Sequence, residues 1–107
     1  MSDFIAFLHE QFAEFGDIHD KRMFGGHGIY YLDIMIGLVA DDVLYLKVDS
    51  ETEAQFTAAG SQPFMYDKAG KRVKMSYFEA PPETLDDPDE MKHWATLAYE
   101  AALRSRR

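Results

Sequence analysis

The sequence contains no cysteine, which excludes both a disulfide framework and a thiolate zinc site. Basic residues are also scarce, because 11 Lys and Arg stand against 19 Asp and Glu and give a formal net charge of −8. Affinity for DNA or RNA comes largely from Lys and Arg that neutralise phosphates. The chain as a whole is therefore expected to be repelled by nucleic acid, and direct nucleic-acid binding is not expected.

Long apolar runs are absent as well. No segment of the sequence approaches the roughly 20 apolar residues that cross a bilayer. The start of the chain, Met1-Ser2-Asp3-Phe4, lacks the basic and apolar regions of a signal peptide. We therefore expect a cytoplasmic protein without membrane association, folded as one domain over residues 1–107.

Three segments have the pattern of helices. Apolar residues spaced three and four apart predict a helix over residues 3–15. Ser50 followed by Glu53 fits a capping box and predicts a short helix over residues 51–59. Asp87-Pro88 offers an N-cap with proline at the first helical position and predicts a last helix that closes the domain.

Short β-prone runs separated by turn residues fill the rest of the chain. The candidate strands are Met23-Phe24, Ile29 to Leu32, Ile34 to Val39, Val43 to Val48, Phe64 to Tyr66 and Val73 to Phe78. Asp33 and Asp41-Asp42 mark two tight turns, and Asp67 to Gly70 joins a second hairpin, so the pairing must be antiparallel. The order helix, three or four strands, helix, two strands, helix predicts an α+β fold. We expect a two-layer sandwich with helices over an antiparallel sheet of about five or six strands.

The segment Met23 to Gly28 contains three glycines within four positions. One interpretation is a nest of N–H groups that binds an anion or small ligand at Gly25 to Gly28, with His27 and Lys47 converging on it. The other is a hairpin corner or β-bulge packed under an aromatic ring. A strand rather than a helix follows the glycines, which favours the structural interpretation.

The strand around Lys47 and the second hairpin carry the remaining candidate groups. Alternation sends Tyr45 and Lys47 to one face of their strand and the flanking leucines to the other. The basic residues of the hairpin are Lys68, Lys71, Arg72 and Lys74. They either contact nucleic acid together with nearby tyrosines, as an accessory factor would, or protect a sheet edge from pairing.

The side chains that usually build catalytic or metal sites show no functional spacing. The histidines, His9, His19, His27 and His93, do not occur at metal-ligand spacing. The acidic residues between Glu79 and Glu90 are interrupted by prolines and do not follow a calcium-loop pattern. We therefore expect no catalytic residue, no metal and no cofactor.

Four segments together resemble the N-terminal domain of the TfoX/Sxy family of competence regulators. They are Arg22 to Tyr30, Leu44 to Asp49, Ala59 to Phe64 and Met75 to Phe78. The resemblance implies an α+β sandwich similar to secretion chaperones. It also marks a set of motif and candidate interaction residues, which are Arg22, Met23, Phe24, Gly25, Gly26, His27, Gly28, Leu44, Tyr45, Lys47 and Tyr77.

The same resemblance implies what kind of function to expect. Full-length competence regulators carry a second, C-terminal domain, whereas this sequence ends at Arg107, so we expect that domain to be absent. Family members are not known as enzymes. The resemblance thus implies a bacterial, non-enzymatic domain for transcription regulation or protein interaction. Its partner would be a protein of unknown identity or a second copy in a homodimer.

Overall fold

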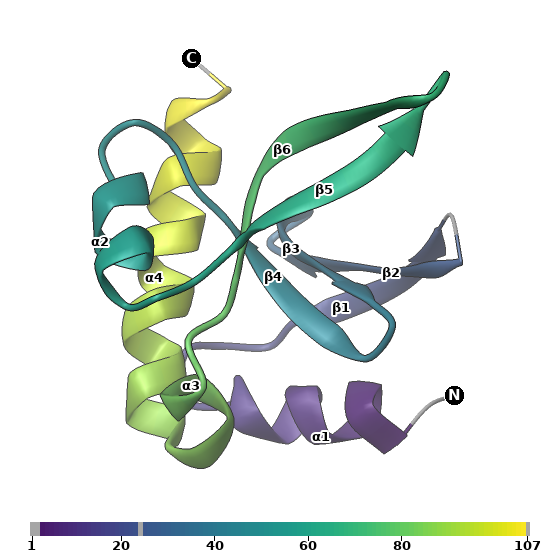
Figure 1. Ribbon diagram of the computed structural model, residues 1–107. Helices are drawn as coiled ribbons and strands as arrows, with labels where there is room; N and C mark the ends of the chain where they lie inside the picture. The colour runs from purple at the N-terminus through teal and green to yellow at the C-terminus, as the bar shows by residue number, and fades with distance from the viewer. Residues whose placement is uncertain (1–2, 24, 107) are drawn as a thin grey trace.

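A computed structural model describes residues 3–23 and 25–106, without the side chain of Lys68. Figure 1 shows the chain path, with the helices to the left and below and the strands to the right. The elements are α1 (Asp3–Gln11), β1 (His19–Met23), β2 (Gly26–Tyr31), β3 (Ile34–Ala40), β4 (Val43–Lys47), α2 (Glu53–Ala58), β5 (Pro63–Lys68), β6 (Lys71–Glu79), α3 (Glu83–Asp86) and α4 (Pro88–Arg104).

The six strands form one sheet in the order β1-β2-β3-β4-β6-β5, and every neighbouring pair is antiparallel. Three of the hairpins close with two-residue loops at Leu32-Asp33, Asp41-Asp42 and Ala69-Gly70, and all six loop residues have positive φ. Positive φ at both loop positions is the type I′ geometry that matches the twist of paired strands. The predicted antiparallel sheet and its turns are confirmed.

The helices lie on one face of the sheet, and the core is between the two layers (Figure 1). Helix α4 packs against β3 and β4. The ring of Phe56 on α2 contacts Trp94 on α4, with 4.8 Å between ring centroids, and also faces Phe78 on β6. Ile5 and Leu8 of α1 are fully buried in the same cluster. This arrangement confirms the two-layer α+β sandwich.

Two helix predictions need correction. Helix α1 ends at Gln11 and is followed by turns up to residue 15, so it is shorter than the predicted range 3–15. Helix α2 begins at Glu53, and its N-cap is Thr52 rather than the predicted Ser50. The Asp49 carboxylate, not a capping box, accepts the backbone N–H of Glu51 at 3.0 Å.

The end of the chain contains one helix that the sequence pattern did not predict. Helix α3 occupies the proline-flanked segment, and the buried Gln11 amide donates to the carbonyl of Thr84 at 2.8 Å. This bond ties α1 to α3. The predicted N-cap of α4 is confirmed, because the Asp87 carboxylate accepts the N–H of Asp89 at 2.9 Å. Among the described residues, no helix is long and apolar enough to cross a membrane.

Candidate functional site

The sheet face opposite the helices, here called the helix-free face, is crossed by one row of paired residues. The row is Lys21, Gly28, Leu38, Tyr45 and Glu79, on β1, β2, β3, β4 and β6. Directly paired residues share a face, and the next residue of each strand points to the other. The adjacent row contains Ile29, Leu46 and Phe78, which are all buried in the core. The helix-free face is therefore distinct from the core.

Gly28 makes room on this face for the ring of Tyr30. A Cβ atom at Gly28 would lie 2.9 Å from Cε1 of Tyr30 and 2.8 Å from Sδ of Met23. The Nζ atom of Lys21 lies 4.8 Å from the centroid of the Tyr30 ring, within cation–π range. The glycine thus leaves room for an aromatic ring over its own strand, as the structural interpretation of the motif predicted.

Lys47 and Tyr77 form a second lysine–aromatic pair on the same face. They are directly paired across β4 and β6, and Nζ of Lys47 lies 5.2 Å from the centroid of the Tyr77 ring. The same Nζ donates to Oγ of Ser76 at 2.7 Å. Burial raises the pKa of Tyr77, and electrostatic repulsion from Tyr30 raises it further. At neutral pH the Tyr77 phenol is therefore a neutral hydroxyl that can donate a hydrogen bond.

Tyr45 connects the middle of the face to the β5 edge. Its ring contacts that of Phe64 at 4.8 Å between centroids, in an edge-to-face arrangement. Burial raises the pKa of Tyr45, and electrostatic repulsion from Glu79 and Asp41 raises it further. Tyr45, Leu38 and Phe64 are half-buried although none of the described helices covers them. The face is therefore an aromatic surface with charged groups at its margin.

The structure divides the predicted motif residues between the two faces. Met23, Gly28, Tyr45, Lys47 and Tyr77 lie on the helix-free face. Arg22, His27 and Leu44 belong to strand positions that face the helix side. Gly25 has a φ of +80° at the β1–β2 connection, and Gly26 begins β2. Phe24 lies outside the described residues.

This division corrects the interpretation of the glycines as an anion nest. His27 pairs with Val39, and Val39 pairs with Leu44, so His27 faces the helix side. Lys47 lies on the other face. Gly26 to Gly28 belong to strand β2, whose backbone is used for pairing with β1 and β3 rather than for binding an anion. The residues proposed for the anion site are therefore not brought together.

The basic residues of the second hairpin do not act as one group. Nζ of Lys74 lies 3.6 Å from Oε2 of Glu53 on α2, and 5.5 Å from the Phe78 ring centroid. Nε of Arg72 lies 3.9 Å from Oδ1 of Asp67. Lys71 is exposed beside the turn that joins it to Lys68. Arg72 and Lys74 thus point to different neighbours, and both lie with Lys71 on β6, between β4 and β5 in the sheet.

Sequence reasoning missed Lys21, Leu38 and Phe64 as members of the helix-free face. Lys21 lies outside the motif segments, and its place over Tyr30 depends on the β1–β2 register. Leu38 is one of several apolar residues in β3, where a register shift at Ile29/Tyr30 interrupts the alternation. To assign these residues to the face, one must know the strand register across more than one hairpin, and the sequence pattern did not supply it.

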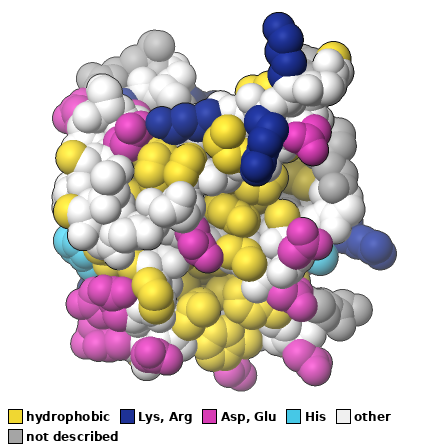
Figure 2. All heavy atoms as spheres, viewed as in Figure 1, with side chains coloured by type: hydrophobic (Ala, Val, Ile, Leu, Met, Phe, Trp, Pro, Cys, Tyr) yellow, Lys and Arg dark blue, Asp and Glu magenta, His cyan; other side chains and the backbone are white. Residues whose placement is uncertain are grey.

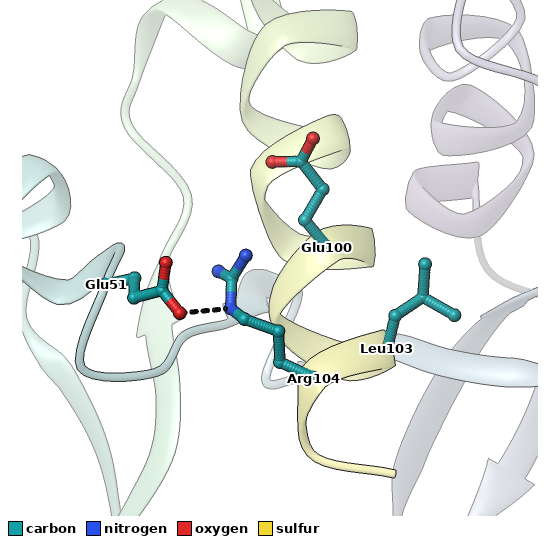
Figure 3. Close-up of a pocket in the computed structure, with 4 residues that line it drawn as sticks. All are labelled: Glu51, Glu100, Leu103 and Arg104. Atoms are coloured by element: carbon teal, nitrogen blue, oxygen red, sulfur yellow. Dashed lines mark ion pairs between the residues drawn. The ribbon is translucent and has the colours of Figure 1, made fainter. Parts of the chain in front are cut away.

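A third group of polar contacts joins the end of α4 to the loop after β4. Nε of Arg104 lies 2.5 Å from Oδ2 of Asp49 and 3.1 Å from Oε2 of Glu51. Nη2 of Arg104 also donates to Oδ1 of Asp49 at 3.1 Å. Figure 3 shows Glu51 and Arg104 facing each other beside Glu100 and Leu103, which line the same shallow depression. These bonds hold the layers together rather than expose reactive groups.

Asp49 makes the stability of the protein depend on pH. The hydrogen bond from Arg104 lowers the pKa of Asp49 below its ordinary 3.8, against the opposing effect of partial burial. A carboxyl with a lowered folded-state pKa stabilises the fold above about pH 4, and the contribution is lost as pH falls further. Asp49→Asn should lower the free energy of unfolding by about 1 kcal/mol at neutral pH, after allowance for solvent screening. Denaturant titrations at about pH 7 and about pH 2.5 measure the difference.

Glu51→Gln is the matched control, because the Glu51 side chain is 65% exposed. We expect little change from it at either pH. A deficit of Asp49→Asn that remains undiminished near pH 2.5 would contradict the role of the Asp49 charge.

The described residues contain no group of three His, Asp or Glu side chains that could hold a metal ion. The arrangement that remains is a surface of tyrosines, Leu38 and Phe64, with two lysines and Glu79 on the same face. It can contact a partner through aromatic area, hydroxyl donors and positive charge.

These features define a class of small α+β domain in which helices cover one sheet face and an aromatic, lysine-containing surface occupies the other. The family model of the TfoX N-terminal domain matches residues 10–102. The chain therefore belongs to the TfoX N-terminal domain family, as the resemblance in the motif segments predicted.

One relative is the DNA transformation protein TfoX1 of Aliivibrio fischeri (strain ATCC 700601 / ES114). The two are 33% identical over 76 aligned positions, and the match covers 67% of this chain and 36% of the relative. The chain thus spans about a third of the length of the curated relative that it matches.

Proposed function

We propose that this chain is a non-enzymatic regulatory domain that binds a protein partner through its helix-free face. The observation that carries the proposal is the convergence of three motif segments on that face. Met23 and Gly28 come from the first segment, Tyr45 and Lys47 from the second, and Tyr77 from the last. These segments are far apart in the sequence, yet their residues meet on the sheet face that the described helices do not cover.

The chemistry of the face suits a protein more than the alternatives. Tyrosines at the centre of a patch, surrounded by apolar and charged groups, are typical of protein interfaces. The two lysines lie over tyrosine rings, and the net charge of −8 opposes binding to nucleic acid. The relative is named a DNA transformation protein, so we place the regulatory role of this chain in DNA transformation.

A pull-down from an extract of the source organism tests this proposal. Leu38→Arg places a charge in the middle of the helix-free face. Leu103→Arg makes the same substitution on α4, where Leu103 is 41% exposed. We expect the wild type and Leu103→Arg to retain the same partner, identified by mass spectrometry, and Leu38→Arg to reduce its recovery at least tenfold.

A second matched pair guards against a folding defect in Leu38→Arg. Lys47→Glu reverses a charge on the helix-free face, and Lys92→Glu does so on an exposed position of α4. Circular dichroism melts establish that each variant is folded. A partner that binds all four variants equally, or the absence of any reproducible partner, would contradict the proposal.

A further inference from the structure

The acidic charge of the protein belongs almost entirely to its helix layer. The segments 1–18, 49–62 and 80–107, which contain the helices and their connections, carry thirteen acidic and four basic residues. The segments 19–48 and 63–79, which form the sheet and its turns, carry six acidic and seven basic residues. The net charge of −8 is thus the sum of −9 in the helix-containing segments and +1 in the sheet-forming segments.

This asymmetry determines which surfaces of two copies can approach each other. Contact between helix layers would bring two strongly acidic surfaces together, and like charges at an interface are unfavourable. Contact between helix-free faces leaves the acidic layers outside, about 30 Å apart for layers spaced about 10 Å. That separation exceeds the Debye length of about 8 Å at physiological ionic strength, so the repulsion is largely screened.

We infer that the helix-free face binds a second copy of this chain and forms a two-fold, four-layer dimer with sheets inside and helices outside. The inference rests on the proposed function, because it names the partner of the same surface. In a two-fold dimer each patch must complement itself. The face carries both signs, since Lys21 and Lys47 share it with Glu79, so a lysine of one copy can meet a carboxylate of the other.

Figure 2 gives a view of the surface that agrees with this charge distribution. Hydrophobic side chains run through the middle of the view, most Lys and Arg side chains in view gather over the β5–β6 hairpin, and acidic side chains cluster beside the lower helices. Leu38, Tyr45 and Phe64 are half-buried without a covering layer of described residues, so they contribute apolar area that association would bury.

The size of the face predicts the strength of the dimer. Six strands about 4.8 Å apart, with five to nine residues of about 3.3 Å each, give a plane of about 25 by 20 Å. Two such faces bury about 1,000 Å², near the lower limit for specific protein interfaces. We therefore expect a reversible dimer with a dissociation constant in the range of about 1 to 100 μM rather than an obligate one.

Sedimentation equilibrium of the purified chain between about 5 and 500 μM tests the inference. We expect the wild type and Leu103→Arg to dimerise with the same dissociation constant, and Leu38→Arg to raise it at least tenfold. Lys47→Glu should weaken the dimer more than Lys92→Glu. Raising the salt from about 0.05 to 0.5 M should change the wild-type constant by less than about threefold, because the acidic layers are far apart.

The outcomes separate this inference from the proposed function. A wild type that stays monomeric at 500 μM overturns the dimer, even where the extract experiment yields a different protein that Leu38→Arg loses. A dimer that Leu103→Arg weakens and Leu38→Arg does not, or one that forms only at high salt, places the interface on the helix layer and also overturns it.

Discussion

Replacing Gly26 by alanine should destabilise the protein by about 3 kcal/mol, at the upper end of what overpacking usually costs. A Cβ atom at Gly26 would lie only 2.1 Å from the carbonyl oxygen of Val39 on β3. That oxygen belongs to the backbone, so it cannot move aside as the end of a side chain could. The β2–β3 pairing must separate at this point, and urea denaturation measures the loss.

Gly25→Ala is the matched control in the neighbouring position. No atom lies within 4 Å of a Cβ built there, but the φ of +80° is unfavourable for alanine. We expect a cost of about 1 kcal/mol from the backbone conformation alone. Equal losses from the two variants would contradict the close approach of Gly26 to β3.

Truncation of Phe56 should destabilise the protein by about 4 kcal/mol, the range for a buried phenylalanine replaced by alanine. Phe56 is fully buried, and its ring contacts that of Trp94 at 4.8 Å between centroids. The matched variant is Phe64→Ala, which removes a half-buried ring in contact with Tyr45 at the same centroid separation. We expect only about 1 kcal/mol from it, because the helix-free face has no covering layer.

This pair separates stability from binding. Thermal melts of both variants, beside the pull-down, should show Phe56→Ala to be much less stable and Phe64→Ala to be folded but weaker in partner recovery. If Phe64→Ala costs as much as Phe56→Ala, the helix-free face is part of the core, and its role as an interface is contradicted.

Much of the fold could be predicted because local signals agree with it. The type I′ turns fall at Leu32-Asp33, Asp41-Asp42 and Ala69-Gly70, where two-residue connections leave only antiparallel pairing. Asp87 before proline begins α4 as expected. In contrast, Ser50 and Glu53 have the spacing of a capping box, yet Asp49 takes the N–H of Glu51 because Arg104, 55 residues later, holds its carboxylate. A contact from the end of the chain overrode a local pattern.

The candidate site was predicted only in part, for a similar reason. Motif residues could be identified from the sequence, but not the face on which each lies. The separation of His27 from Lys47 follows from pairing across three strands, β2, β3 and β4. The position of Tyr30 over Gly28 depends on a side-chain contact along one strand. Lys21 joined the site only through the β1–β2 register.

The two-layer arrangement explains why the motif glycines and tyrosines occur together. Gly28 provides space for Tyr30, and Lys21 and Lys47 each lie over a tyrosine ring, so the face is preorganised before any partner binds. The Asp49–Arg104 contact fixes the end of β4 to α4 behind it. The core thus stabilises the fold, and the helix-free face is the surface that we propose for recognition.

Photo-cross-linking from position 45 tests the central claim most directly. A benzophenone amino acid replaces Tyr45 on the helix-free face or Lys92 on the exposed side of α4, and the cells are irradiated. We predict a covalent adduct of defined mass from position 45, containing a second copy or another protein, and none from position 92. Adducts from position 92 alone would show that recognition occurs on the helix layer and would contradict the account.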